Sequence, residues 1–592
     1  MQKYARAIRL LPVILYISVI PLIVRAVPYT APIGDLPWMY GEDDTIQWDF
    51  FNLAKLNVLE AVTAFAVIIF FVLLLTKRIR LKRSAVFIPV ALYTAAVLVS
   101  FCLSDHRDIA LRGELGHFEG LLCVLCYMFM LFYTIQVLER VDDALCVMGF
   151  LAVTVLIECI IGVSQLVGKD LLASRAGMYM IAGNREISFA FAPGQVYQTV
   201  ANMNYVPLWL SLVVPVVILA AAVCAARLIR YPDTRTLKSR EALIFLAAII
   251  LCILILLNCI GAKSTGGSLG IGISLIVLAV LAIPDKVFRR CTLAAVSLLA
   301  AMTVMLLYVR SPADEVSVEY LRTGQDGIGI SMAGHPMTIR SDMQGIITAF
   351  DESGEQVEAY TVREGDEAEY VFDKEGYWAG ALIARSMGTG SDAYVQLDIN
   401  RGEKYLFHFY ENGQVKLCTP YGYEIDAGDT EHIGFKGHYG FASGRGYIWA
   451  TSLPIIGHSP VLGAGPGTFM VTFPQTDYAG RATAGVPSTI IVDKAHNIYI
   501  QTAVNNGLMG LIAFIGIICT VCGKAYRSMA NNGKRGPGKL AEMDVKSILL
   551  TGGALGIIAF ATGAITCDSS ISVMPVFYGM IGMVAAVSEA DK

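Results

Sequence analysis

A histidine and an asparagine, His496 and Asn497, begin an apolar segment in the run Ala495-His496-Asn497-Ile498-Tyr499-Ile500-Gln501. A histidine can serve as a general base near neutral pH, because its unperturbed pKa is about 6.5. The alternative is an interfacial histidine that hydrogen-bonds a helix end, and the spacing by itself favours this simpler interpretation.

An arginine precedes them in the run Ser443-Gly444-Arg445-Gly446-Tyr447-Ile448-Trp449. Its planar guanidinium carries five donors that suit phosphate oxygens. Taken alone, an arginine that pairs with a lipid phosphate or an acidic residue is the favoured interpretation. The glycine-rich stretch 462–469 lies between the two motifs. It indicates a tight turn, since it lacks the Gly-Lys-Ser/Thr ending of a phosphate loop.

The elements that position these residues follow from composition. Of the 592 residues, 55% are hydrophobic and only 16% are charged, against about 25% charged in a typical soluble domain. This excludes a cytosolic enzyme, a disordered chain and a coiled coil. It also excludes a porin-like barrel, whose segments alternate instead of running apolar. We expect a polytopic α-helical membrane protein with about 12 transmembrane helices of ~20 residues each. The spans we predict are 8–26, 54–75, 84–103, 119–138, 145–167, 203–226, 242–260, 266–283, 291–309, 503–522, 547–566 and 570–588.

Basic residues in the loops predict the orientation of these spans. With the N-terminus inside, 24 lysines and arginines fall in cytoplasmic segments and 8 in the short outer loops. We therefore expect a multi-pass protein of the cell (cytoplasmic) membrane, with both termini in the cytoplasm. Residues 310–502 would then form a large extracytoplasmic segment.

That outer segment is hydrophilic and acidic. Residues 311–445 hold 23 acidic and 10 basic side chains, a net charge of −13, while the rest of the chain carries +9. Alternating stretches at 336–340, 345–350, 369–372, 393–397 and 404–410 predict strands of a small all-β, sandwich-like domain. We divide the chain into a membrane domain with spans 1–9 (1–310), a β-rich insert (311–443), a catalytic loop (444–502) and spans 10–12 (503–592). No basic face indicates nucleic-acid binding.

Taken in order, the motifs resemble the O-antigen ligase superfamily, which joins O-antigen ligases, Wzy-type O-antigen polymerases and bacterial O-linked oligosaccharyltransferases. The family pattern pairs an arginine with a large apolar residue four positions on, as in Arg445 and Trp449. It then has His-Asn and nine residues before Gly-x-x-Gly, as in His496-Asn497 and Gly507-x-x-Gly510. The runs 116–122 and 199–205 are similar to two further family segments. Where many relatives carry Ser-Arg-Gly, this chain has Lys263-Ser264-Thr265-Gly266.

The resemblance implies a glycosyltransferase of polysaccharide biosynthesis in the cell envelope. It would move a glycan from a polyprenyl-diphosphate carrier, such as undecaprenyl diphosphate, to a hydroxyl of a saccharide or other surface acceptor. His496 would be the base and Arg445 would bind the diphosphate. The other substrate-binding candidates are Asn497, Lys263, Arg185, Arg175, Asn204, Glu119 and Tyr499. Direct displacement would invert the anomeric carbon.

We expect no cofactor and a metal-independent reaction, because no Asp-x-Asp signature is present. His432, His438 and Glu431 leave a metal site open in the insert, although ordinary surface histidines are the favoured interpretation. The donor, the acceptor and the bilayer would be the partners. The alternative function is a membrane transporter or flippase of lipid-linked glycans, although such folds tend to show internal repeats. Ligases, polymerases and protein glycosyltransferases share these motifs, so the acceptor, the sugars, the role of the insert and the oligomeric state stay open.

Overall fold

The structure is a computed structural model. It describes residues 2–30, 46–185, 191–230, 235–281, 317–325, 327–342, 346–364, 367–372, 382–387, 393–399, 403–419, 423–425, 430–488, 490–531 and 537–590.

Most of the described chain is helical. Six segments are long and apolar enough to cross a membrane, and four shorter apolar helices accompany them. Apolar runs of this length form helices in lipid because a helix satisfies its own backbone hydrogen bonds. The expected span at 291–309 lies outside the described residues. The helices that overlap the other eleven expected spans are α1 (Gln2–Ile14), α2 (Leu53–Leu75), α3 (Phe87–Leu103), α5 (Leu121–Val137), α6 (Val141–Leu166), α8 (Tyr205–Leu210), α9 (Val214–Arg230), α10 (Arg235–Ala262), α11 (Thr265–Leu281), α16 (Ile498–Asn531), α17 (Val545–Gly563) and α18 (Met574–Glu589).

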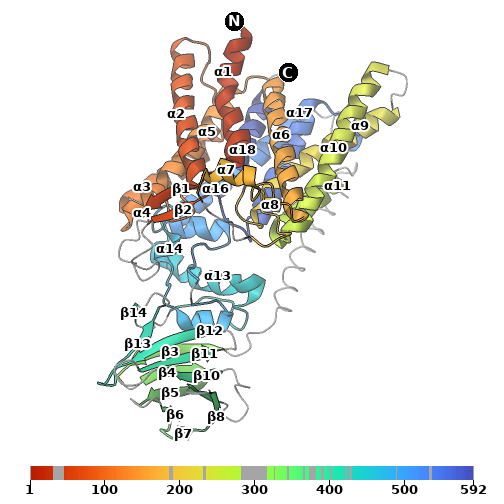
Figure 1. The fold of residues 1–592 in the computed structure, drawn as a ribbon. Helices are drawn as coiled ribbons and strands as arrows, with labels where there is room; N and C mark the ends of the chain where they lie inside the picture. Colours follow the sequence, from red (N-terminus) through yellow and green to blue (C-terminus); the bar gives the residue numbers. More distant parts are fainter. Residues whose placement is uncertain are drawn as a thin grey trace.

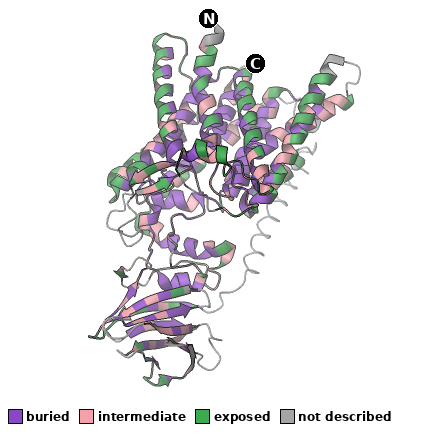
Figure 2. Ribbon diagram, in the orientation of Figure 1, coloured by how far each residue is buried: buried purple, intermediate pink, exposed green. Residues whose placement is uncertain are grey.

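The bundle is buried at its centre and apolar on its outside. Almost every residue of α18 from Met574 to Val587 is buried, and α18 packs against α5, α16 and α17. Outer helices such as α10 instead expose large apolar side chains, as Figure 2 shows. On α10 these include Leu243, Leu246, Ile253, Leu256 and Ile260, each more than half exposed. Such a surface is costly in water and suits lipid.

Twelve of the described β strands form two antiparallel sheets with a common core, while β1 (Val27–Thr30) and β2 (Ile46–Asp49) pair with each other in a separate two-stranded sheet. Five strands follow one another in the first sheet: β3 (Val318–Gly324), β4 (Gly327–Met332), β5 (His335–Ser341), β6 (Ile347–Asp351) and β7 (Gln356–Val357). The second sheet has seven, in the order β14-β13-β12-β11-β10-β9-β8. Their bounds are β8 (Ala359–Glu364), β9 (Glu367–Phe372), β10 (Leu382–Met387), β11 (Ala393–Ile399), β12 (Glu403–Phe409), β13 (Val415–Cys418) and β14 (Glu424–Ile425). One apolar cluster joins both sheets. The expected β sheets are therefore present, and the five strands we predicted overlap β5, β6, β9, β11 and β12.

The segment between the sheets and the bundle contains three short helices, which Figure 1 places between the two regions. They are α13 (Phe441–His458), α14 (Phe469–Thr472) and α15 (Tyr478–Ala484). In the same view, the two chain ends mark the end of the bundle away from the β strands.

Helix α16 is interrupted at Gly507, which has φ 66° and ψ −178°. The interruption frees backbone groups that a continuous helix would pair. Residues just before and within the glycine-rich stretch replace those partners: Leu508 N–H donates to the carbonyl of Pro460 at 2.8 Å, and Gly465 N–H donates to that of Asn505 at 2.9 Å. Non-helical backbone at membrane depth is tolerated only when its polar groups are satisfied in this way. The glycine-rich turn and Gly507 thus form one packed unit.

Candidate functional site

His496 pairs with a carboxylate that is distant in sequence. Its Nδ1 lies 2.7 Å from Oδ2 of Asp568, which sits in the turn between α17 and α18. Asp568 is buried, whereas the His496 side chain is 35% exposed. An ionised Asp568 accepts a hydrogen bond from Nδ1–H, which leaves the lone pair on Nε2. This is the arrangement in which an imidazole accepts a proton from a substrate.

The charges of this pair shift its pKa values in opposite directions. Asp568 raises the pKa of His496 above its ordinary value, and burial and the Arg445 charge oppose the rise only in part. Burial alone would raise the pKa of Asp568, but His496 and then Lys494 outweigh it and lower that pKa. Asp568 is therefore ionised at neutral pH, and it stabilises the imidazolium that forms when His496 takes up a proton.

The backbone of Ala495, the residue before His496, is held at both its N–H and its carbonyl. Trp449 Nε1 donates to the carbonyl of Ala495 at 2.9 Å, and Ala495 N–H donates to Oε1 of Gln501 at 2.8 Å. His496 itself has φ 50°, in the left-handed region that few non-glycine residues adopt. The tryptophan four residues after Arg445 therefore holds the histidine motif directly, which connects the two sequence motifs in space.

A small apolar core supports this arrangement from the loop itself. It brings α13 and α14 together with the strand-like segment before His496. Its buried members are Tyr447, Ile448, Trp449, Phe469, Phe473, Val492, Ala495 and Val504. The loop thus holds its polar residues on a packed scaffold.

Asn497 and Tyr499 have structural partners. Oδ1 of Asn497 accepts from the backbone N–H of Tyr499 at 2.9 Å and of Ile500 at 3.1 Å, which caps the N-terminus of α16. The hydroxyl of Tyr499 donates to the carbonyl of Ala561 on α17 at 2.6 Å. The structure therefore gives both residues contacts that fix the start of α16 next to His496.

Arg445 lies close enough to His496 for its charge to act on the pKa of the imidazole. Its Nη1 donates to the carbonyl of Ala442 at 2.7 Å, and its Nε is buried without a hydrogen-bond partner. An arginine with an unused donor is suited to an anion.

Lys494 is a buried cation next to the pair formed by His496 and Asp568, which we call the dyad. Its ammonium donates to the Tyr205 hydroxyl at 3.0 Å and to the carbonyl of Ser569 at 2.8 Å. Oε2 of Glu119 accepts from Ser569 Oγ at 2.6 Å. Burial alone would lower the pKa of Lys494, but the Tyr205 hydroxyl and then Asp568 outweigh it and raise that pKa. Lys494 and Glu119 thus hold the turn that carries Asp568 from two sides.

A second cluster fastens the segment before α5 to the loop. His117 Nε2 lies 2.6 Å from Oδ2 of Asp493, and Oε2 of Glu114 accepts from Met470 N–H at 2.7 Å. These contacts hold the segment that leads to Glu119 against the loop that carries His496.

Lys263 and Asn204 flank the other side of the Asp568 turn. The segment after Lys263 packs so tightly there that a Cβ on Gly266 would lie 2.0 Å from Thr566 Oγ1. The Cys567 thiol lies 3.8 Å from the carbonyl of Asn204. Lys263 itself is exposed. The structure thus brings the Lys263 and Asn204 segments to the residues adjacent to Asp568.

The two remaining candidate cations lie on a different element. Arg175 is the first residue of α7 (Arg175–Ala182) and is exposed, and the guanidinium of Arg185 lies 4.7 Å from the centre of the Trp48 ring. No contact between either arginine and His496 is present in the described part of the chain. The diphosphate role that the resemblance implies for them stays a prediction.

A polar cavity of about 50 Å³ adjoins the dyad inside the bundle. Its lining includes Glu119, Gln501, Asn505, Asn506 and Ser569. It is large enough for water and far smaller than a typical ligand pocket of 300–1,000 Å³. A saccharide must therefore approach His496 from the exposed side of the imidazole.

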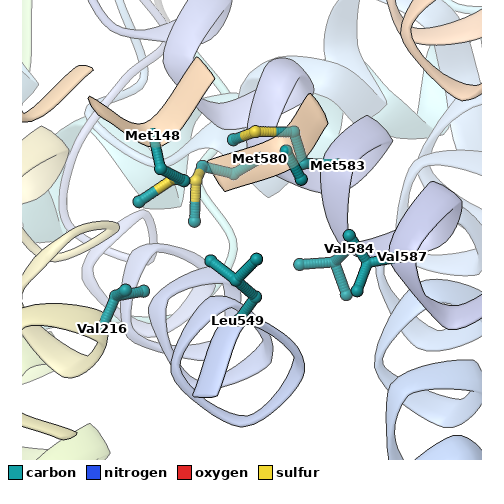
Figure 3. Close-up of a pocket in the computed structure, with 8 residues that line it drawn as sticks. Met148, Val216, Leu549, Met580, Met583, Val584 and Val587 are labelled. Carbon is teal, nitrogen blue, oxygen red and sulfur yellow. The ribbon is translucent and has the colours of Figure 1, made fainter. Parts of the chain in front are cut away.

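Figure 3 shows a different crevice, which is apolar and has a volume of about 10 Å³. It lies between α6, α9, α17 and α18 and is lined by Ala144, Met148, Val216, Leu549, Met580, Met583, Val584 and Val587. None of these groups can bind a charged or hydroxylated ligand, so this crevice is a packing feature of the helices.

Metal ligands are not gathered in the described ranges: no group of three or more His, Cys, Asp or Glu side chains could hold an ion there. His432 pairs instead with the buried Asp477, with Nε2 and Oδ2 2.8 Å apart. His432 is thus a half-buried structural residue.

Comparison with known families agrees with the motifs. Residues 388–515 match the family described as O-Antigen ligase. The match includes Arg445, the glycine-rich stretch, His496-Asn497 and Gly507-x-x-Gly510. It begins inside the β-rich insert, where none of the family motifs named above lies. It supports an O-antigen ligase/polymerase family membrane protein with a function in glycan transfer, as the sequence predicts. No curated protein matches the chain.

The sequence motifs did not identify Asp568 as the partner of His496. Asp568 lies in the run Thr566-Cys567-Asp568-Ser569-Ser570, between two apolar spans. A charged residue in so short a loop between two apolar spans was the only available signal. Lys494 was visible beside His496 but was given no role.

Proposed function

We propose that this protein transfers a glycan from a polyprenyl-diphosphate carrier to a hydroxyl of a saccharide or other surface acceptor. The observation that carries the proposal is the dyad of an exposed imidazole and a buried carboxylate, His496 and Asp568, with Arg445 beside it. A general base and an anion-binding cation at one place are the two groups that this reaction needs.

The reaction balances with these groups. Nε2 of His496 takes the proton of the acceptor hydroxyl while its oxygen attacks the anomeric carbon. The bond from that carbon to the diphosphate oxygen breaks, and the polyprenyl diphosphate leaves with the electron pair. Attack opposite the leaving group inverts the anomeric carbon.

Arg445 would bind the diphosphate and offset the negative charge that grows on it. Its planar fork can meet two oxygens at once. Lys263, whose segment packs against the Asp568 turn, would add a point charge. Asn204 and Glu119 would act through their own segments, which meet that turn from opposite sides. The diphosphate is a good leaving group, so the proposed mechanism uses no metal ion.

The site also fits the expected orientation in the membrane. His496 lies just before the start of α16, at the end where the chain enters this helix from the segment that carries α13, α14 and α15. With both termini in the cytoplasm, this end would lie at the outer headgroup level of the cytoplasmic membrane. The diphosphate of a carrier lipid lies at the same level.

The test uses purified protein in lipid nanodiscs with a synthetic polyprenyl-diphosphate trisaccharide as donor and a free trisaccharide as acceptor. Released polyprenyl diphosphate and elongated saccharide are measured by mass spectrometry. We expect His496→Ala to lower transfer at least about 10²-fold, within the usual range for a general base. His432→Ala is the matched control, because it removes a histidine from the similar pair with Asp477.

Undiminished transfer by His496→Ala would show that the base assignment is wrong. Movement of the lipid-linked trisaccharide across vesicles without any release of diphosphate would favour the flippase alternative.

A further inference from the structure

A ligand-sized pocket lies beside the C-terminal end of α6. Its volume is about 440 Å³, within the range typical of small-molecule sites. The segments 165–174 and 191–197 line it. It is separate from the small cavity next to His496, with which it shares no lining residue.

The lining combines aromatic rings with fixed polar groups. The rings of Phe191 and Tyr197 stack with their centres 3.7 Å apart. The Tyr197 hydroxyl donates to Asp170, whose Oδ1 also accepts from Leu172 N–H at 2.9 Å. Gln195 adds a side-chain amide. Saccharides need these two features together, because their C–H faces pack on aromatic rings and their hydroxyls need oriented donors and acceptors.

The pocket holds one cation and one carboxylate. Lys169 lines it, is exposed, and has no ion-pair partner among the described side chains. Arg175 follows the lining residue Ser174, and the only lining carboxylate, Asp170, is already engaged by Tyr197. An anionic group on the ligand would therefore find a free cation.

The pocket is tied rigidly to the catalytic region. Oε1 of Gln165 accepts from the backbone N–H of Tyr197 at 3.0 Å and of Gln198 at 2.7 Å. The same segment continues to Tyr205, whose hydroxyl accepts from Lys494. One continuous segment thus runs from the pocket to the floor of the dyad.

We propose that this pocket is a subsite for an acidic saccharide unit, such as a hexuronic acid, in the glycan that is transferred. Its ligand class rests on the proposed function. The half-buried Phe191 ring, which stacks on the buried Tyr197 ring, packs against the sugar face. Gln195 binds hydroxyls, and Lys169 binds the carboxylate of the sugar. The subsite makes the enzyme selective for acidic repeat units.

The test measures binding directly, without transfer. Full-length protein in nanodiscs is titrated with trigalacturonic acid and with neutral galactotriose, followed by ligand-observed NMR. We expect trigalacturonic acid to bind at least about tenfold more tightly, because a charge-assisted hydrogen bond contributes about that factor. Lys169→Gln should abolish the preference, and Phe191→Ala should weaken both probes.

Glu431→Gln is the control, because it changes a polar residue lining another pocket, of about 320 Å³, and should alter neither affinity. Equal affinity for the two probes in the unchanged protein, or an unchanged preference in Lys169→Gln, would overturn the proposal.

His496→Ala should bind trigalacturonic acid normally. Loss of transfer with retained binding in that variant supports the subsite independently of the base, whereas retained transfer would contradict only the proposed base.

A transfer assay then shows whether the donor or the acceptor carries the acidic unit. Lys169→Gln should raise KM about tenfold for whichever substrate, donor or acceptor, carries the hexuronic acid, and leave KM for a neutral one unchanged. An equal rise for acidic and neutral substrates would contradict recognition of the carboxylate.

Discussion

Replacement of Asp568 by asparagine tests the dyad most directly. The change keeps the shape of the side chain and removes its charge 2.7 Å from Nδ1 of His496. The asparagine amide can also donate to Nδ1, which would place the imidazole proton on Nε2. An Nε2 that carries a proton cannot accept one from the acceptor hydroxyl.

The size of the effect follows from the geometry. Opposite unit charges about 4 Å apart attract by about 4 kcal/mol at an effective dielectric constant near 20. Because the His496 side chain is 35% exposed, screening reduces this to roughly 1–2 kcal/mol. The wrong tautomer adds a loss of about 10²–10⁴ in kcat, the range of general base catalysis.

The assay is transfer in nanodiscs between pH 5.5 and 9. His496 must be neutral to act as a base, and Asp568 raises the pKa of His496. Activity of the unchanged protein should therefore rise with pH, with a midpoint above the ordinary histidine value of about 6.5. In Asp568→Asn the residual activity should have a lower midpoint, because the carboxylate that raises the pKa of His496 is gone. His432→Ala should keep the original midpoint.

A kcat within twofold of the unchanged protein, together with an unchanged midpoint, would refute the reasoning. Thermal melting of each variant identifies a loss that comes from unfolding alone. Asp568→Glu offers a second check, since it restores the charge with a longer side chain and should recover part of the pH midpoint.

Three further changes test the supports of the site. Trp449→Phe removes the donor to the Ala495 carbonyl. It should lower kcat about tenfold with little change in KM when the donor is titrated. A change in KM alone would contradict the role of Trp449 in holding the backbone before His496. Gly507→Ala would place a Cβ 2.1 Å from the Val461 carbonyl oxygen in left-handed backbone; it should destabilise the protein by more than about 1 kcal/mol, measured by thermal melting. Lys494→Met leaves buried carboxylates without their common cation and should destabilise by about 3–5 kcal/mol; an unchanged melting temperature would contradict its structural role.

Much of the fold could be predicted from the sequence because the signals are local. Apolar runs of about 20 residues predict helices that lipid can surround, and α2, α6 and α10 lie where those runs fall. Alternation predicts strands with one buried face, as in β11, where Ala393, Val395 and Leu397 are buried. Short strands such as β7 and β14 carry too few residues for alternation to be visible.

The catalytic motif was also local in sequence. Arg445 with Trp449, and His496 followed by Gly507, are recognisable from residue types and spacing. Their meaning needed the fold: Trp449 holds the peptide before His496, and Gly507 interrupts α16 where the glycine-rich turn inserts. From the sequence, Gly507 is recognisable only as part of the Gly-x-x-Gly pattern.

Residue types, spacing and hydropathy determined that this is a membrane protein with a glycan-transfer motif. Tertiary structure decided which carboxylate stands behind His496, which buried cation supports it, and that Arg175 on α7 and Arg185 just after it make no contact with His496 in the described residues. The reason is physical. Hydropathy and motif spacing act within one segment, whereas Asp568 reaches His496 only because the turn between α17 and α18 packs against the start of α16.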